Sequence, residues 1–153
     1  MKNPFVDLEG YNCFVCSPDN PVGLHLDFYL DGEMVKAGWE PEDQYQGYPN
    51  VLHGGIQATL LDEVASWAVY AIGGTGGVTA RMEIQYKKPV YIDKGEIALT
   101  SQIIELKKRI MTMQSYLYDG DGNLCTEALV DYFIYPENIA REKMHYPGKE
   151  AFF

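Results

Sequence analysis

The stretch from Val51 to Gly77 constrains the fold of this chain more than any other feature. It holds two charged residues in twenty-seven, the neighbours Asp62 and Glu63, and its apolar residues recur at helical spacing. We expect a helix from about Gly54 to Ile72 that is apolar on most sides, so other elements must surround it. A carboxylate in such a helix is costly to bury unless it is paired or takes part in chemistry.

The expected helix begins at His53-Gly54-Gly55. The first N–H groups of a helix have no partner within it, and the positive end of the helix dipole stabilises negative charge there. Free amides at Gly54 and Gly55 would therefore suit an oxyanion or an anionic ligand. Together with a carboxylate further along the same helix, they indicate attack on a carbonyl group.

Length and composition narrow the class of protein. A chain of 153 residues that is 46% apolar forms one globular domain with a core of its own. The formal net charge of −10 argues against nucleic-acid binding. No apolar run is long enough to span a membrane, and the N-terminus lacks the apolar segment of a secretory signal. Three cysteines, an odd number, favour reduced thiols and a cytoplasmic location.

The expected elements follow the order β-β-α-β-β-β-β, which defines an α+β domain with one sheet and one long helix. Alternating apolar residues and turn dipeptides place the strands at 24–30, 34–39, 78–86, 95–106, 110–118 and 124–135. We divide the chain into an irregular leader (1–23), a folded domain (24–135) and a polar tail (136–153). The tail is expected either to dock on a neighbour or to be disordered.

Positive charge is concentrated in one part of this acidic chain. Residues 81–109 carry seven basic and four acidic side chains. Two interpretations are open: a solvated sheet face, or a site for an anionic ligand such as the phosphates of a nucleotide-bearing carrier. Under the second interpretation Lys87, Lys88 and Arg109 are the candidate ligands.

A pair of cysteines, Cys13-x-x-Cys16, lies in the leader. It has the spacing of half a zinc site, which His25 or Cys125 could complete. The spacing between Cys16 and His25 does not match a defined zinc motif, however, and the chain has no second C-x-x-C. We therefore expect reduced, partly buried thiols, no metal and no organic cofactor.

Three segments resemble the hotdog-fold thioesterases, and especially the phenylacetate-pathway-like acyl-CoA thioesterase group. They are L-H-G-G-I-Q-A-T-L-L-D-E at 52–63, G-V-T-A-R-M-E-I-Q-Y-K-K-P-V at 77–90 and D-G-D-G-N-L at 119–124. The resemblance implies an antiparallel sheet wrapped around one long central helix, and an acyl-CoA substrate. It also implies a homodimer or homotetramer in which two subunits form one continuous sheet, with active sites at their interface.

The resemblance assigns roles to individual residues. Asp62, nine residues after the motif histidine, would be the general base or a nucleophile that forms a transient anhydride. Gly54 would donate its N–H to the thioester carbonyl, as an oxyanion donor does. His53 would help to position the carbonyl or the sulfur, and Thr79 would orient the attacking water.

Some assignments stay open at this stage. Glu63 is the competing carboxylate, and because one residue turns a helix by about 100°, only one of the two acids should face the site. The resemblance also implies an amide side chain in the preceding loop, which could be Gln46 or Asn50. Two other functions compete with hydrolysis. One is a non-catalytic acyl-CoA-binding module. The other is a hydratase or dehydratase, which would need a histidine in the loop 40–52, where there is none.

Overall fold

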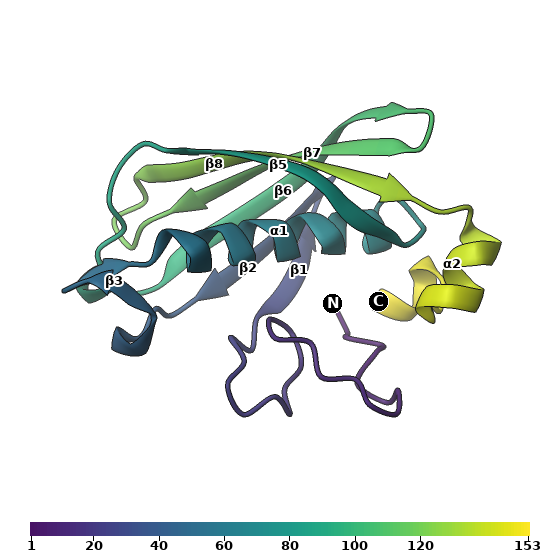
Figure 1. Ribbon diagram of the computed structural model, residues 1–153, viewed down its shortest axis with the longest axis horizontal. Helices are drawn as coiled ribbons and strands as arrows, with labels where there is room; N and C mark the ends of the chain where they lie inside the picture. Colours follow the sequence, from purple (N-terminus) through teal and green to yellow (C-terminus); the bar gives the residue numbers. More distant parts are fainter.

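The computed structural model describes residues 1–153, as one antiparallel sheet with a long helix packed across one of its faces (Figure 1). The helix is α1 (Gly54–Ala71). The sheet has the order β1-β2-β6-β7-β8-β5, and β3 and β4 form a separate two-stranded ribbon before the helix. The strands are β1 (Asp27–Asp31), β2 (Met34–Trp39), β3 (Gln46–Tyr48), β4 (Val51–Leu52), β5 (Gly77–Tyr86), β6 (Ile97–Lys107), β7 (Ile110–Tyr118) and β8 (Leu124–Ile134).

The predicted α+β class and the sheet wrapped around one long helix are confirmed. β2 and β7 have the predicted bounds, whereas β1 begins at Asp27 instead of Leu24. The difference has a physical cause, because the N–H groups of Leu24 and Leu26 bond to the carbonyl oxygens of Phe14 and Val15 in the leader. The short strands β3 and β4 were not predicted.

Helix α1 forms the centre of the core, as its apolar composition requires. Its buried side chains come from all faces: Gln57, Leu60, Leu61, Val64, Ala65, Ser66, Trp67, Ala68, Val69 and Ala71. Trp67 stacks on Phe28 with ring centroids 4.2 Å apart. His53 caps the helix N-terminus, and Gly74 with φ +71° takes the left-handed conformation just beyond its C-terminus.

Strand β5 is an edge strand, with no partner in this chain on one side. Its register to β8 shifts between Thr79 and Arg81, so that Ala80 is the extra residue of a β-bulge. The bulge lets Thr79 face the helix while Arg81 points away. From Met82 onward the helix-facing positions resume the ordinary alternation.

Both ends of the chain pack on α1, which corrects the expectation for the tail. Residues 136–153 form α2 (Glu137–Met144) and a 3₁₀ turn (Lys149–Phe152). Phe152 is fully buried, 5.8 Å from the Phe5 ring and 5.5 Å from the Trp67 ring between centroids. The leader and the tail lie together beside the helix, as Figure 1 shows, and Lys2 N–H bonds to Phe152 O at 2.9 Å. The tail therefore completes its own chain's core.

Candidate functional site

Asp62 lies at the centre of a hydrogen-bonded group between α1 and the sheet. Thr79 Oγ1 is 2.9 Å from Asp62 Oδ1 and 3.2 Å from Oδ2. Tyr132 donates its phenol O–H to Oδ1 at 2.8 Å. Oδ1 thus has two close donors, and Oδ2 has only the longer contact. The arrangement fixes the carboxylate and leaves Oδ2 the freer of its two oxygens for a water molecule.

Strand register explains why Thr79 and Tyr132 meet at this carboxylate. The two residues are cross-strand partners in the β5–β8 pair, and both face the helix. Burial, and then the neighbouring charge of Asp62, raise the pKa of Tyr132 well above its ordinary value, so its oxygen keeps the proton that it donates. The resemblance implies that Thr79 orients the attacking water, and the structure shows its hydroxyl in contact with the Asp62 carboxylate. Tyr132 was not predicted, because only the register reveals it.

The start of α1 presents one free amide instead of two. His53 Nδ1 accepts the N–H of Gly55 at 2.9 Å, which engages that amide and corrects the expectation that it is available to a ligand. The N–H of Gly54 donates no hydrogen bond within the chain. Because Nδ1 is an acceptor, neutral His53 carries its proton on Nε2, and His53 is an exposed residue.

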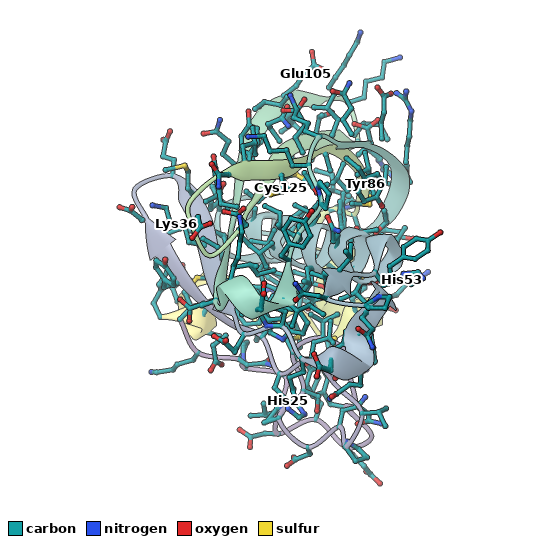
Figure 2. All side chains as sticks on the ribbon, turned by 90° about the vertical axis from the view of Figure 1, so that its left-hand side faces the viewer. His25, Lys36, His53, Tyr86, Glu105 and Cys125 are labelled. Atoms are coloured by element: carbon teal, nitrogen blue, oxygen red, sulfur yellow. The ribbon has the colours of Figure 1, made fainter.

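An open groove of about 480 Å³ lies at this helix start. His53, Gly54, Tyr86 and Lys88 line it, and Tyr86 donates its phenol O–H to Gly54 O at 2.8 Å. Figure 2 shows His53 and Tyr86 on the same side of the molecule. The sequence did not single out Tyr86. The groove therefore combines a free amide, an exposed imidazole and a lysine.

The free amide and the carboxylate are too far apart within one chain to act on one carbonyl. Asp62 is the eighth residue after Gly54 in α1. Because a helix rises by about 1.5 Å per residue, the two residues lie about 12 Å apart along the helix axis. In a reactive complex the attacking water lies about 3 Å from the carbonyl carbon, and the carbonyl oxygen lies about 3 Å from its hydrogen-bond donor. The Gly54 amide and the Asp62 carboxylate of one chain therefore do not meet at one carbonyl, although they belong to the same helix.

The three basic candidates do not form one cluster. Lys88 lines the groove, and Lys87 pairs with Glu127 at 3.2 Å. Arg109 lies in the β6–β7 turn, where its carbonyl bonds to Ile134 N–H, at the opposite end of β5 from the two lysines. Ten strand residues at about 3.3 Å each put these ends about 30 Å apart.

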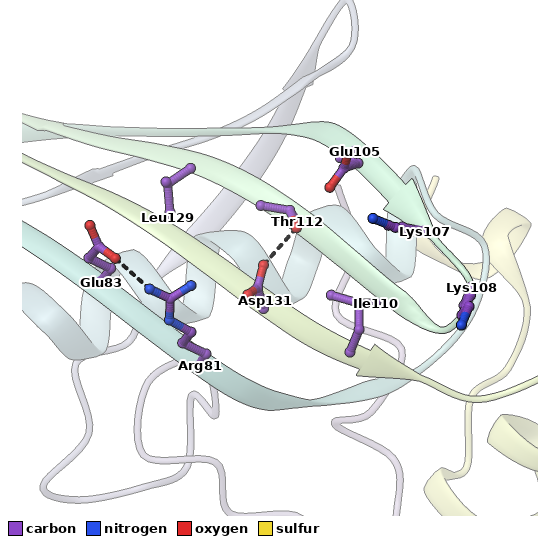
Figure 3. A pocket seen from close by; sticks show the side chains of 9 residues that line it. All are labelled: Arg81, Glu83, Glu105, Lys107, Lys108, Ile110, Thr112, Leu129 and Asp131. Atoms are coloured by element: carbon purple, nitrogen blue, oxygen red, sulfur yellow. Dashed lines mark hydrogen bonds and ion pairs between the residues drawn. The ribbon is translucent and has the colours of Figure 1, made fainter.

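The outer face of the sheet near this turn carries mixed charge (Figure 3). Arg81 pairs with Glu83 at 2.6 Å, and Thr112 donates to Asp131 at 2.6 Å. Lysines and a further carboxylate share the same hollow: Glu105, Lys107 and Lys108. Acidic and basic groups balance there, which fits a solvated sheet face.

The remaining candidates have other partners. Glu63 faces away from Asp62, toward the leader, as its one-residue offset predicts; its Oε1 accepts the indole N–H of Trp67 at 3.2 Å. Gln46 Oε1 accepts the backbone N–H of Asn50, and Asn50 Oδ1 accepts that of Asp93. Both amide side chains therefore stabilise the turn before the helix.

Comparison with known proteins agrees with this architecture. Acyl-coenzyme A thioesterase 13 of Mus musculus is 34% identical over 79 residues, which cover 51% of this chain and 56% of the relative. The crystal structure of the thioesterase superfamily protein RHA08564 superposes with a TM-score of 0.72 at 27% identity, covering 79% of this chain and 62% of the other. The chain thus spans roughly three fifths of the length of these relatives.

A third likeness concerns the fold alone. The crystal structure of smu.793 from Streptococcus mutans, bound to acetyl CoA, has a TM-score of 0.66 at 18% identity and covers 73% of this chain and 90% of that one.

The fold and the helix start define a hotdog-fold protein. The thioesterase superfamily matches residues 49–126, which include the whole of α1 and β5, and the chain belongs to this family. None of its helices is long and apolar enough to cross a membrane.

Proposed function

We propose that this protein hydrolyses acyl-CoA thioesters. The observation that carries the proposal is the Asp62 carboxylate, held by Thr79 and Tyr132 on the same helix whose first amide, that of Gly54, is free. In the reaction, water adds to the acyl carbon, the carbon–sulfur bond breaks, and the products are a carboxylic acid and CoA thiol. Mouse acyl-coenzyme A thioesterase 13 carries the same activity in its name.

Asp62 activates the water in this proposal. A water at Oδ2 gives up a proton to the carboxylate as it attacks the carbonyl carbon. The Thr79 and Tyr132 donors keep the carboxylate in one orientation. Direct attack by Oδ2, giving an anhydride that water then hydrolyses, uses the same geometry. Negative charge that develops on the thioester oxygen is stabilised by the Gly54 N–H and the helix dipole.

The gap of about 12 Å between the two groups is bridged by a second copy of the chain. Edge strand β5 exposes a backbone that can pair with another β5. Antiparallel pairing about a twofold axis between Met82 and Glu83 puts Thr79 opposite Tyr86 of the other copy. Since Thr79 contacts Asp62 and Tyr86 contacts Gly54, each site combines the carboxylate of one copy with the amide of the other.

The same pairing brings the separated basic residues to one end of the joined sheet. Arg109 lies at the Thr79 end of β5, and Lys88 lies at the Tyr86 end. Pairing therefore places the Arg109 of one copy at the same end of the joined sheet as the Lys88 of the other, with strands β8 and β5 between them. Two cations there suit the phosphates of CoA. The acetyl-CoA-bound structure of smu.793 supports a CoA ligand for this fold.

The test is a comparison of hydrolysis and binding in Asp62→Asn. A panel of short, long and aryl acyl-CoAs is assayed by release of free thiol, and CoA binding is measured by calorimetry. We expect kcat to fall by roughly 10²–10⁴-fold while the Kd for CoA stays within a few-fold. Asp131→Asn is the matched control. Asp131 is the neighbour of Tyr132 on β8, but its carboxylate accepts a hydrogen bond from Thr112 on the outer face of the sheet.

Two results would contradict the proposal. Binding of acyl-CoA by the wild-type protein, with no thiol released from any member of the panel, would identify a non-catalytic binding module. Equal loss of kcat in the Asp62→Asn and Asp131→Asn variants would show that the Asp62 carboxylate has no special part in the reaction.

A further inference from the structure

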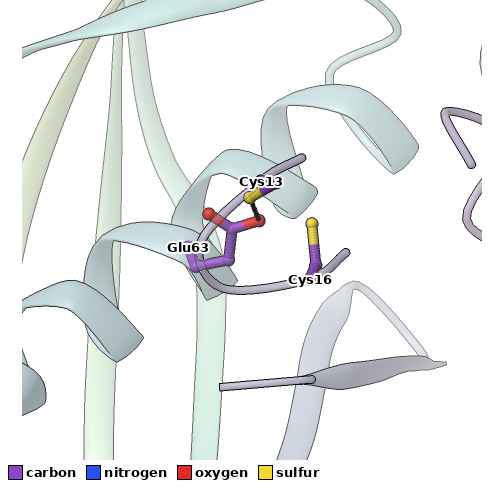
Figure 4. A group of neighbouring side chains, drawn as sticks. All are labelled: Cys13, Cys16 and Glu63. Carbon is purple, nitrogen blue, oxygen red and sulfur yellow. Dashed lines mark hydrogen bonds between the residues drawn. The ribbon is translucent and has the colours of Figure 1, made fainter. Parts of the chain in front are cut away.

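The leader brings two thiols against the side of α1 that faces away from Asp62. Cys13, Cys16 and Glu63 gather there, with one ligand atom of each within 4.8 Å of the others (Figure 4). The two thiols come from one turn of the leader, and the carboxylate comes from the helix fifty residues later. Neither His25 nor Cys125, the partners that the sequence suggested, belongs to this group.

The group contains acidic side chains and no cation. It opens on a cavity of about 620 Å³ whose walls include Tyr11, Trp67 and Tyr70 and, among basic side chains, His145 but no lysine or arginine. Glu63 forms no ion pair. A half-buried carboxylate next to two thiols, without a compensating charge, is unfavourable as an isolated arrangement. A divalent cation would supply the missing charge.

Each of the three side chains also receives a hydrogen bond from a neighbour. Val15 N–H donates to Cys13 Sγ at 3.4 Å, and Trp67 Nε1 donates to Glu63 Oε1 at 3.2 Å. Tyr11 OH lies 2.9 Å from Cys16 Sγ. Asn3 Nδ2 donates to the same phenol oxygen at 3.1 Å, so the phenol proton is free to point at the sulfur. Outer donors of this kind hold metal ligands in their anionic state.

The distance between Cys13 and Glu63 fits two ligands of a tetrahedral ion. Zinc bonds to thiolate sulfur at about 2.3 Å and to carboxylate oxygen at about 2.1 Å, so two such ligands at a tetrahedral angle lie about 3.6 Å apart. Cys13 Sγ and Glu63 Oε1 are 3.7 Å apart. In the metal-free protein the thiol proton of Cys13 occupies this contact, and an ion would replace it.

We propose that Cys13, Cys16 and Glu63 bind a zinc ion that fastens the leader to α1. Two sulfurs and one oxygen form a donor set that zinc prefers, and the fourth position opens on the cavity, where a water molecule completes the tetrahedron. The site is separate from the Asp62 group, because Glu63 and Asp62 point to different sides of the helix. Metal binding here is therefore independent of the proposed hydrolysis.

The experiment measures zinc in the full chain, purified under reducing conditions without chelators. Mass spectrometry of the metal gives the zinc content, and a chromophoric chelator gives the affinity by competition. We expect about one zinc ion per chain, and a thiolate-to-metal charge-transfer band after substitution with cobalt(II). Zinc should also raise the Tm of the metal-depleted protein, since it binds the folded state.

Variants separate this site from adventitious binding. Cys13→Ser and Cys16→Ser should lose the ion and the cobalt band. Glu63→Gln, which keeps the shape of the side chain, should weaken zinc binding by at least roughly tenfold. Cys125→Ser is the matched control, because Cys125 is a buried thiol elsewhere that contacts Pro89 O. It should bind zinc as the wild type does.

Three outcomes would overturn the proposal. The first is a wild-type chain that takes up no zinc at micromolar concentration while its thiols are reduced. The second is equal zinc binding in the Cys13→Ser, Glu63→Gln and Cys125→Ser variants, each shown to be folded by circular dichroism. The third is a Cys13–Cys16 disulfide as the resting state of protein purified without oxidant.

Discussion

Tyr132→Phe tests how the carboxylate is held. The substitution removes one oxygen and keeps the buried ring, so packing changes little. It deletes the 2.8 Å hydrogen bond to Asp62 Oδ1 and leaves Thr79 as the remaining donor. A hydrogen bond to a charged group contributes about 1.5–3 kcal/mol. If that contribution is expressed in the transition state, kcat falls by roughly 10- to 150-fold.

The assay is steady-state hydrolysis of the best acyl-CoA, with kcat and KM determined separately. Because Tyr132 touches the base and lies away from the groove at the helix start, the loss should be in kcat, with KM changed by less than about threefold. Tyr116→Phe is the control. Tyr116 is also a strand tyrosine, half-buried on β7, and its hydroxyl has no hydrogen-bond partner.

A Tyr132→Phe protein that is fully folded and retains kcat within twofold of wild type would refute this prediction. That result would mean that the phenol does not control the orientation of Asp62 during the reaction. A rise in KM at constant kcat would also contradict it, because it would place Tyr132 in substrate binding.

Three further predictions concern the same framework. Thr79→Val keeps the shape of the side chain but removes the second donor to Asp62, so kcat should fall by roughly tenfold. Thiol release at the wild-type rate would exclude a role for Thr79 in holding the carboxylate. Phe152→Ala should lower the free energy of unfolding by about 3–5 kcal/mol in urea titrations, because the ring is fully buried; a loss below about 1 kcal/mol would contradict the packed tail. Burial opposes ionisation of Asp119, yet hydrogen bonds from Asn123 and Lys94 hold its pKa at about 2. This depressed pKa stabilises the fold above the unfolded value of about 3.9 and stops doing so as the pH falls through about 2. The Tm difference between wild type and Asp119→Asn should therefore shrink from pH 4 to pH 2; a constant difference would disprove the linkage.

Apolar periodicity and turn dipeptides predict those helices and strands whose structure depends on neighbouring residues in the sequence. Helix α1 and strands β2 and β7 follow from apolar periodicity and from the Asp31-Gly32 and Asp119-Gly120 turns. The tail was not predicted to pack on its own chain, because Tyr146 is a single aromatic residue and Phe152 belongs to a short apolar run, 151–153, that follows a charged segment. Their burial depends on a hollow beside Trp67 that only the folded chain provides.

The candidate site divides in the same way. Asp62 and Gly54 are candidates because of the apolar helix and its Gly-Gly start, and the resemblance to the hotdog-fold thioesterases implies Thr79. Tyr132 joins them only through strand register and the bulge at Ala80, which no local pattern encodes. The approach of Cys13 to Glu63 likewise joins residues fifty positions apart. Helix geometry alone gives the separation of about 12 Å between Gly54 and Asp62, and this separation is the reason that we propose a composite site.

The central claim, that the carboxylate and the amide of one site come from two chains, is tested by subunit complementation. Gly54→Pro removes the amide hydrogen at the first helical position, where proline is tolerated, and His53 already has an extended conformation (φ −60°, ψ 133°) that suits a following proline. Gly54→Ala, which keeps the amide, is the control. A purified heterodimer of Asp62→Asn and Gly54→Pro chains contains one intact site, so it should recover about half of the wild-type activity, although each parent is inactive. A heterodimer as inactive as its parents would contradict the account.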